Sequence, residues 1–467
     1  MKKLMSAALC LALLLTLVPG MVNAEEESLF SDRDLVQEPD LEDGEKITLA
    51  GQSVTIDHAG VFLLSGSIEN GQITVAAGEE DKVQLVLDGV NIHSGLGPAI
   101  EVTTGDKVFI TLASGSENSL SSDAFSEDGG SGVIYSKADL TLNGGGQLTV
   151  TTSQGHGIVC KDTLAITGGS YIVQASGHGI SGKDALNIAD GAFSITTGGG
   201  STAVQMKASD GFGQWGWGGE SVSTQEEDTV KAKGLKSDGP ITVLAGSFTL
   251  DCADDAVHAG GAVTISAGTW TIRTADDGIH SDENVTIDGG SFEIPYCYEG
   301  IEGKNVTIRD GSISITSDDD GINAVGEDSA TGFRIPGMDT GAVITVDGGE
   351  ITIVSKGDSL DSNGTILLNG GKLNLICSGS GNTALDSEIG ITNNGAEVTT
   401  NDGSENGGGM RGGFGRNGQL AGGRGDGQNG SQFPQDGQRP EKGQKPSFER
   451  ELPDGASQAT PSAGNQS

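Results

Sequence analysis

A unit of 21 or 22 residues repeats along most of this chain, and it constrains the fold more than any other feature of the sequence. Residues 261–282, 283–303 and 304–324 agree in pattern throughout, and the same unit recurs at 137–160, 161–182, 183–207, 238–260, 341–363 and 364–388. A fixed period of this length is the signature of a solenoid, in which each unit packs against its neighbours.

Each unit contains three short runs of alternating apolar and polar residues, separated by a glycine-containing turn and a polar turn. Three short strands in a coil of about 22 residues predict an all-β, single-stranded parallel β-helix. Because alternation sends every second side chain inward, one position per coil should stack into a core ladder. Its predicted members are Tyr171, Phe193, Phe248, Trp270, Phe292, Ile313, Ile351 and Leu373. Trp270 is therefore expected to be structural.

The chain divides into regions of different composition. Residues 1–24 have the charged start, apolar run and small residues of a signal peptide, which predicts export, and 25–44 are expected to be a linker. The β-helix is predicted over 45–400, with insertion loops at 208–231 and 325–340. Residues 401–467 are rich in Gly, Gln and Asn and have little to bury, so we expect a disordered tail.

Net charge restricts the partners of this chain. The formal charge is −39, whereas residues 401–467 hold seven Lys or Arg against eight Asp or Glu, so the charge belongs to the region before them. Such a surface repels nucleic acid and anionic membranes and attracts divalent cations. No stretch after the signal peptide is apolar enough to span a bilayer. We expect a secreted, soluble monomer, either free or associated with the cell surface.

Carboxylates recur at one position of successive coils. Asp255, Asp277, Glu299 and Asp320 are separated by 22, 22 and 21 residues, and Asp254, Asp276 and Asp319 form a parallel column. Neighbouring strands lie about 4.8 Å apart, so these acids should be close neighbours that repel one another. A calcium ion is the natural compensation, because it takes six to eight oxygen ligands. The alternative is that each Asp merely caps a turn.

A second acidic cluster lies further along the same edge. Asp358 continues the first column, whereas Asp361 and Asp386 occupy the position held by His258, His280, Glu302 and Asn323 in earlier coils. These residues extend the predicted set of calcium ligands. Zinc held by the pairs His156 with His178 and His258 with His280 is a competing interpretation, but the sequence favours hydrogen-bonded turn histidines.

Two further groups suggest roles in carbohydrate chemistry. Lys233 and Lys236 stand one coil before Asp255 and His258, where an amine with a lowered pKa could act as the base of a calcium-assisted β-elimination. The alternative is that these lysines only offset the acidic edge. Trp215 and Trp217 lie in the first insertion, where they either stack on sugar rings or pack inward against the solenoid.

The amino-acid sequences of several segments resemble those of a known family. "GVIYSKADLTLNGGGQLTV", "GHGIVCKDTLAITGGSYIV" and "GHGISGKDALNI", with "LVLDGVNI" upstream and "DSLDSNG" and "NTALDSE" downstream, are similar to bacterial, largely clostridial, exported carbohydrate-binding β-helix proteins. The resemblance covers roughly residues 45 to 390. It implies a right-handed parallel β-helix akin to pectate and other polysaccharide lyases, with calcium bound by Asp255, Asp277 and Asp320, and binding to cellulose and polygalacturonate.

Three functions remain open on the sequence alone. The first is a calcium-dependent polysaccharide-binding protein, and the second is a polysaccharide lyase. The resemblance supplies no sure counterpart to the catalytic lysine of the lyases, because Lys233 and Lys236 flank a long insertion. The third is an adhesive or spacer solenoid of the cell surface.

Overall fold

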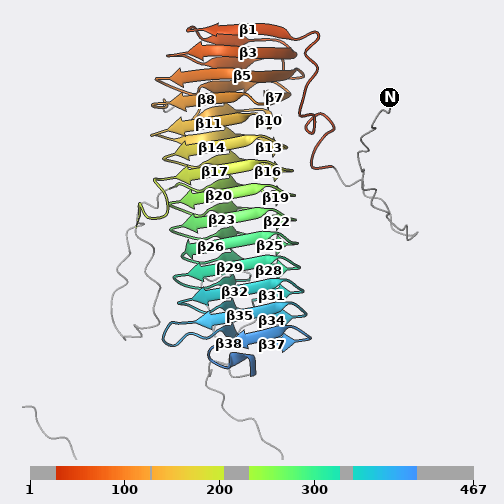
Figure 1. Ribbon diagram of the computed structural model, residues 1–467, viewed down its shortest axis with the longest axis vertical. Coiled ribbons are helices and arrows are strands. Elements are labelled where there is room, and N and C mark those ends of the chain that lie inside the picture. Colours follow the sequence, from red (N-terminus) through yellow and green to blue (C-terminus); the bar gives the residue numbers. More distant parts are fainter. Residues whose placement is uncertain (1–27, 127–128, 205–230, 327–339, 407–467) are drawn as a thin grey trace, which may run out of the picture. The chain divides into compact units, whose positions relative to one another are not determined.

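The computed structural model describes residues 28–126, 129–204, 231–326 and 340–406 (Figure 1). Over these residues the protein is all-β, and the strands pair in parallel, as the repeat predicted. The one helix in this part of the chain is a single 3-10 turn, η1 (Ser404–Asn406). Among these residues no helix has the length and apolarity that crossing a membrane would require.

The strands form three parallel ladders. The first contains β1 (Glu45–Ala50), β3 (Gly60–Ile68), β5 (Lys82–Ser94), β7 (Lys107–Leu112), β10 (Asp139–Gly144), β13 (Thr163–Ile166), β16 (Ala185–Ile188), β19 (Ile241–Val243), β22 (Val263–Ile265), β25 (Asn284–Ile287), β28 (Asn305–Ile308), β31 (Val343–Val346), β34 (Thr365–Leu368) and β37 (Gly390–Asn393). The second contains β8 (Glu117–Ser122), β11 (Gln147–Thr152), β14 (Ser170–Ala175), β17 (Ala192–Thr197), β20 (Ser247–Cys252), β23 (Thr269–Thr274), β26 (Ser291–Cys297), β29 (Ser312–Ser317), β32 (Glu350–Ser355), β35 (Lys372–Cys377) and β38 (Glu397–Thr400). The third contains β2 (Val54–Ile56), β4 (Ile73–Ala76), β6 (Ile100–Thr104), β9 (Gly132–Ser136), β12 (His156–Cys160), β15 (Ile180–Gly182), β18 (Leu235–Ser237), β21 (Val257–Ala259), β24 (Ile279–Ser281), β27 (Ile301–Gly303), β30 (Ile322–Ala324), β33 (Leu360–Ser362) and β36 (Leu385–Ser387).

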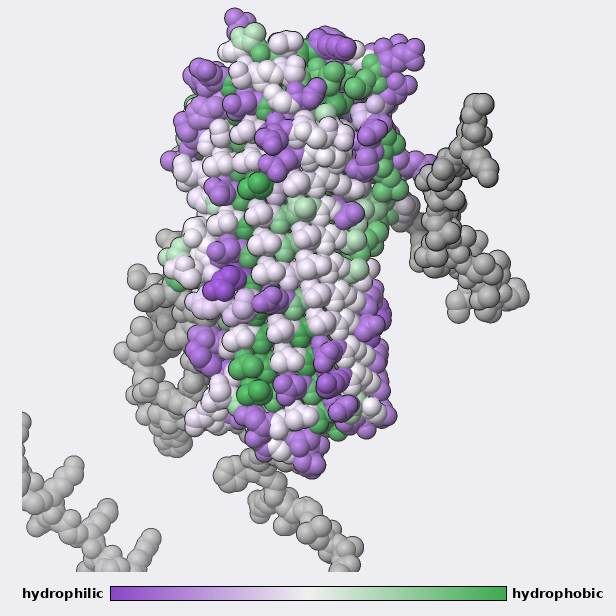
Figure 2. All heavy atoms as spheres, viewed as in Figure 1, coloured by the Kyte–Doolittle hydropathy of each residue, from purple (hydrophilic) through white to green (hydrophobic). Residues whose placement is uncertain are grey.

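From β7 to β36, each coil contributes one strand to each ladder and pairs with the coils before and after it. The strand β22, for example, pairs with β19 and β25, while β24 of the same coil pairs with β21 and β27. The long strand β5 pairs with both β7 and β8, so the first and second ladders form one 25-stranded sheet, whereas the third is a separate 13-stranded sheet. Figure 2 shows residues of similar hydropathy aligned across successive coils on the face in view.

The interior is a continuous apolar core with an aromatic stack in the second ladder. Register places Tyr171, Phe193, Phe248, Trp270 and Phe292 in line. Their rings are parallel within 16°, with centroids 3.7 to 5.7 Å apart. The line continues, as expected, through Ile313, Ile351 and Leu373. All of these side chains are buried.

A glycine precedes the stack by two residues in each of these coils and makes the tight turn between the ladders. Gly290, for instance, has φ of 109°, which side chains of L-residues rarely allow. A Cβ there would lie 2.9 Å from the carbonyl oxygen of Gly268, its counterpart one coil earlier. The glycine column therefore lets successive turns approach closely enough to keep the coils in register.

Both ends of the predicted β-helix differ from expectation. Residues 401–406, expected to begin the tail, close the final coil, because Asn401 accepts the Cys377 amide at 3.0 Å and Asp402 accepts the Ala384 amide at 2.8 Å. At the other end, part of the expected linker 25–44 packs against the strands. The insertion residues 208–230 and 327–339 and the tail residues 407–467 lie outside the described residues.

Candidate functional site

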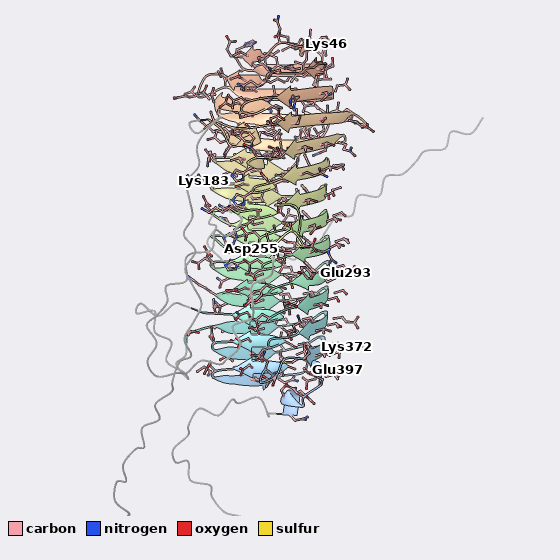
Figure 3. The ribbon with its side chains drawn as sticks, turned by 90° about the vertical axis from the view of Figure 1, so that its left-hand side faces the viewer. Lys46, Lys183, Asp255, Glu293, Lys372 and Glu397 are labelled. Atoms are coloured by element: carbon pink, nitrogen blue, oxygen red, sulfur yellow. The ribbon has the colours of Figure 1, made fainter. Side chains whose placement is uncertain are left out.

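The predicted acids lie in two columns along the third ladder. The "turn column" precedes the strands and consists of Asp255, Asp277, Glu299, Asp320 and Asp358. The "strand column" occupies the outward-facing central position of each strand, where register aligns His258, His280, Glu302, Asn323, Asp361 and Asp386. Figure 3 labels Asp255 and, apart from it across the width of the coils, Glu293 of β26. The repeat therefore brings together residues far apart in sequence.

The turn column is built into the backbone of the coils. Main-chain amides of Ala256, Gly278, Gly300 and Gly321 donate to the column carbonyl of the next coil, at 2.9 to 3.1 Å. Side chains add a second set of bonds, because Oδ1 of Asp255 accepts the Asp277 amide at 3.1 Å. Oδ1 of Asp320 likewise accepts the Asp358 amide at 2.6 Å. Asp255 and Asp320 therefore do cap turns. Each uses one carboxylate oxygen to accept a main-chain amide of the next coil.

A lysine and a histidine contact the acids in the upper part of the columns. Lys233 Nζ lies 2.9 Å from Asp254 Oδ1 and 2.5 Å from Asp255 Oδ2. His258 Nδ1 lies 2.9 Å from the same Asp255 oxygen. Burial would raise the pKa of Asp255, but the His258 hydrogen bond and the Lys233 charge outweigh burial and hold this pKa below its ordinary value. Here the protein supplies its own counter-ions.

One coil further on, a histidine is shared between two acids. His280 Nδ1 lies 3.0 Å from Asp277 Oδ2 and 3.8 Å from Glu302 Oε2. Burial would lower the pKa of His280, but the hydrogen bond to Asp277 and the surrounding carboxylates raise it to about 9. Burial raises the pKa of Asp277 to about 7, because His280 only partly offsets burial and the neighbouring Asp255, Asp276 and Glu302. This cluster mixes nitrogen and oxygen donors.

The lower part of the columns offers oxygen donors. Carboxylate oxygens of Asp358, Asp361 and Asp386 all lie within 4.8 Å of one another. Asp320 adjoins them, and burial followed by the charge of Asp361 raises its pKa to about 8. Asn323, in register with Asp361, has a buried Oδ1 with no hydrogen-bond partner among the described residues. We call these five residues the oxygen corner.

The donor atoms of the oxygen corner are of the kind that a hard cation prefers. Four carboxylates and one amide oxygen are the ligand types that calcium takes in adaptable geometry. Nitrogen donors are better suited to transition metals, so the clusters containing His258 and His280 suit calcium less well. Gly357 lets the backbone approach these carboxylates closely, because a Cβ there would lie 2.2 Å from Asp320 Oδ1 and 2.6 Å from Asp319 Oδ1.

The structure also brings together part of the other predicted acidic column, which consists of Asp254, Asp276 and Asp319. Ligand oxygens of Asp254, Asp255 and Asp276 lie within 4.8 Å of one another. Lys233 bridges the first two, so a cation there would compete with an ammonium group already in place. In the later coil, the Asp319 carbonyl accepts the Ser317 hydroxyl at 3.0 Å and the Gly357 amide at 2.9 Å.

The lysines have the roles of counter-ions. Burial would lower the pKa of Lys233, but Asp255 and Asp254 raise it above its ordinary value. A general base at neutral pH needs the opposite shift, so Lys233 lacks the lowered pKa that the lyase hypothesis requires. Lys236 forms an ion pair with Asp238. Trp215 and Trp217 lie outside the described residues.

The histidines considered as zinc ligands are hydrogen-bonded. His156 Nδ1 accepts the His178 amide at 2.8 Å, and His178 Nδ1 accepts the Lys233 amide at 3.1 Å. Their rings stack with centroids 4.7 Å apart. His156 and His178 are therefore hydrogen-bonded turn histidines, as the sequence favoured. Each accepts an amide of the next coil, as Asp255 and Asp320 do in the turn column.

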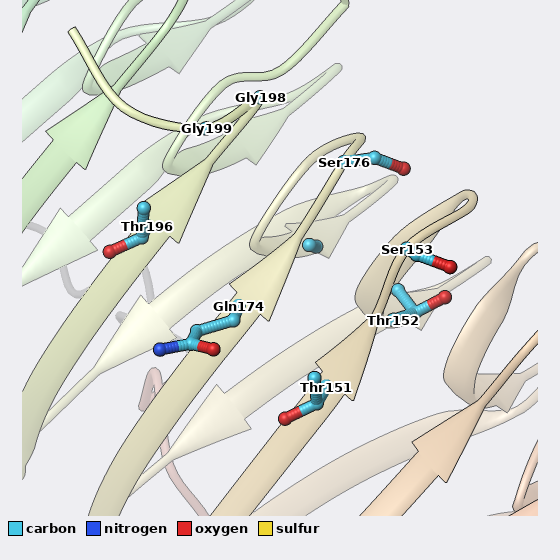
Figure 4. A pocket seen from close by; sticks show the side chains of 9 residues that line it. Thr151, Thr152, Ser153, Gln174, Ser176, Thr196, Gly198 and Gly199 are labelled. Carbon is cyan, nitrogen blue, oxygen red and sulfur yellow. The ribbon is translucent and has the colours of Figure 1, made fainter. Parts of the chain in front are cut away.

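A separate depression lies on the second ladder, away from the acids. It measures about 580 Å³ and spans β11, β14 and β17 (Figure 4). Its lining is uncharged and consists of Thr151, Thr152, Ser153, Gln174, Ala175, Ser176, Thr196, Gly198 and Gly199. None of the residues predicted from the sequence as ligands or bases lines it.

Comparison with known proteins places the chain in a family. Residues 50–214, 202–278 and 274–411 match the family described as carbohydrate-binding domain-containing protein, and together these matches cover more than half of the chain. The chain therefore belongs to the carbohydrate-binding domain-containing family, as the sequence resemblance indicated.

Two individual proteins can be compared with the chain. It is 36% identical over 162 residues to a carbohydrate-binding domain-containing protein of Acetivibrio thermocellus, an alignment that covers 33% of this chain and 54% of that protein. The chain thus spans about half the length of the curated relative that it matches. A solved structure of a polysaccharide lyase-like protein from C. thermocellum, a gadolinium derivative, aligns with 19% identity and a TM-score of 0.32, covering 75% of this chain and 99% of that one.

Proposed function

We propose that this protein is an extracellular, calcium-dependent carbohydrate-binding protein that recognises acidic or plant-type polysaccharide, with polygalacturonate and cellulose as its ligands. The single observation that carries the proposal is the oxygen corner, where carboxylate oxygens of Asp358, Asp361 and Asp386 lie within 4.8 Å of one another. Asn323, in register with Asp361, adds an Oδ1 that has no hydrogen-bond partner among the described residues. Membership of the carbohydrate-binding family supplies the class of ligand.

The coil-by-coil pairing supports a more specific fold for this function. We infer that the parallel ladders wind as a right-handed, single-stranded β-helix, in which every coil repeats the surface of the previous one. A polysaccharide is also a repeating chain, so a surface that repeats about every 4.8 Å can contact several sugar units in similar ways. The acidic columns run along the same direction.

Calcium explains how so negative a surface would hold an acidic glycan. The ion takes six to eight oxygens, and the oxygen corner supplies only some of them. A uronate carboxylate and its neighbouring hydroxyls can complete the coordination. Without the cation, the carboxylates of protein and sugar would repel one another. Binding should therefore depend on calcium for acidic glycans and to a smaller extent for neutral ones.

The lyase and spacer alternatives have less support. The ammonium of Lys233, held by Asp254 and Asp255, is poorly suited to remove a proton. A spacer would need no cluster of buried, like-charged oxygens, since their repulsion costs stability.

The test is retention of the mature protein on immobilised polygalacturonate, with calcium and with chelator. The double variant Asp361→Asn/Asp386→Asn removes two charges of the oxygen corner, and Asp347→Asn, an exposed acid of the first ladder, is the matched control. We expect chelator and the double variant each to reduce retention strongly, and the control to bind normally. Undiminished retention of the folded double variant would reject the proposal.

A further inference from the structure

The segment before the first strand packs on a strip of the outer face of the first ladder, here called the groove, where Asp34 contacts Lys107 and Thr141. Residues 30–37, here called the N-terminal segment, form turns and add no strand to the sheet. The segment runs beside the strands in Figure 1. Its contacts reach residues more than 100 positions away, as when Gln37 Oε1 accepts the Gly144 amide at 2.8 Å. The first ladder is fully paired through its own backbone, so the segment is held largely by side-chain contacts.

The groove beneath the segment has an unusual lining for an outer strand face. Gln84, Phe109 and Thr141 are aligned in register across β5, β7 and β10, and all three are buried. Phe109 points outward, because Val108 and Ile110 on either side of it belong to the core. An outward aromatic ring beside amide and hydroxyl groups is a lining typical of sugar-binding sites.

Asp34 inserts its carboxylate into this groove and is 1% exposed. Its Oδ1 lies 2.8 Å from Lys107 Nζ and accepts the Thr141 hydroxyl at 2.5 Å. Burial would raise the pKa of Asp34, but the hydrogen bonds from Lys107, Thr141 and Ser31 hold it below its ordinary value. The groove thus stabilises a carboxylate in its ionised form.

A planar group of the segment covers the aromatic ring. The Arg33 guanidinium lies 4.4 Å from the Phe109 ring centroid. Lys107 Nζ is 5.7 Å from the same centroid. A flat group on the ring and a carboxylate at the lysine are therefore held side by side. A uronic acid has this combination of features, since its ring has an apolar face and carries a carboxylate.

We propose that this groove is a second, cation-independent binding site for a uronic acid unit, and that the N-terminal segment occupies it as a built-in competitor. Phe109 carries the sugar ring, and Lys107 and Thr141 hold its carboxylate. Gln84 contacts its hydroxyls together with Asn143, whose Nδ2 now donates to the Asp34 carbonyl at 3.2 Å. The inference takes only the class of ligand from the proposed function. Binding in the groove needs no calcium, so an experiment can reject the groove site or the calcium-dependent function without rejecting the other.

The test measures binding of trigalacturonate by calorimetry with chelator present throughout. The variant Asp34→Asn/Gln37→Ala keeps the whole chain but weakens the hold of the segment, and Asp32→Asn alters an exposed acid of the same segment. We expect the double variant to bind at least about tenfold more tightly than the wild type, and the control to match the wild type. Added Lys107→Met should abolish the gain, because it removes the charged donor that holds the sugar carboxylate.

A second measurement uses the unaltered protein. Trypsin cleaves after Arg33, and a ligand that displaces the segment should speed this cleavage. We expect trigalacturonate to accelerate it in chelator, and a neutral cello-oligosaccharide or a triaspartate peptide to leave it unchanged. The proposal is overturned if the folded double variant gains no affinity, if trigalacturonate does not alter cleavage, or if the acidic peptide acts as well as the sugar.

Discussion

Single residues of the columns serve two purposes. Asp320 uses Oδ1 to accept the Asp358 amide of the next coil, and its other oxygen remains for the oxygen corner. Asn323 is similarly divided, because its Nδ2 donates to Glu299 Oε2 at 3.2 Å and its Oδ1 lacks a partner in the part of the chain that the structure describes. Structural capping and cation binding are therefore compatible.

The first prediction separates charged from neutral ligands. Asp361→Asn should weaken calcium binding by about tenfold or more, because it removes a carboxylate from a partly buried site where charge interactions are strong. Asn323→Ala should weaken binding by only a few-fold, since it removes one neutral oxygen. Calorimetric titration of chelated protein measures both. Equal affinities for the wild type and Asp361→Asn would remove this residue from the site.

The second prediction concerns His178. Burial, the neighbouring His156 and the lysines Lys236 and Lys233 lower its pKa to about 3 from 6.5. Between these values the unfolded chain binds more protons than the folded one, so the free energy of unfolding falls as pH falls from about 6.5 towards 3. His178→Asn should reduce this acid-side loss in chelated protein.

The measurement for His178 is thermal unfolding at about pH 7.5 and pH 4.5, on either side of the unfolded pKa. The control is His93→Asn, a histidine whose side chain is 43% exposed. The assignment fails if His178→Asn loses as much melting temperature on acidification as the wild type and the control do.

At the scale of elements, the second ladder depends on its aromatic stack. Trp270 lies between Phe248, at 3.7 Å, and Phe292, at 5.7 Å, and is 1% exposed. Its Nε1 is buried without a hydrogen-bond partner among the described residues. The indole therefore contributes through packing, and its polar atom contributes nothing favourable.

The third prediction follows from this packing. Trp270→Ala should lower the free energy of unfolding by about 3 to 5 kcal/mol, because it leaves a cavity in the stack. Trp270→Phe keeps a stacked ring and removes the unpartnered N–H, so it should cost far less than the alanine variant. Chemical denaturation compares the two. Similar losses for both variants would show that the stack is not the source of stability.

Much of this organisation can be predicted from the sequence because the chain repeats. A period of 21 or 22 residues suffices to align Asp255 with Asp277 and Tyr171 with Phe193. It cannot reveal contacts that do not follow the period. Asp34 meets Lys107 and Thr141 only because a non-repeating segment folds back. The raised pKa of Lys233 and the unpartnered oxygen of Asn323 depend on side-chain positions that the repeat does not determine.

For the whole molecule, we expect calcium to stabilise the fold. A ligand that binds only the folded state adds about 2.7 kcal/mol at a concentration one hundred times its dissociation constant. Burial and then the charge of Asp361 raise the pKa of Asp320 to about 8, and a bound cation would offset that charge repulsion. The effect should be lost in the double variant Asp361→Asn/Asp386→Asn and kept in Asp347→Asn.

A cation between carboxylates of consecutive coils should stabilise the folded protein, so the decisive experiment compares the melting temperature in calcium and in chelator at the same ionic strength. We expect a rise of several degrees in calcium that saturates with concentration and is absent from the double variant. Identical melting curves in calcium and chelator would contradict it.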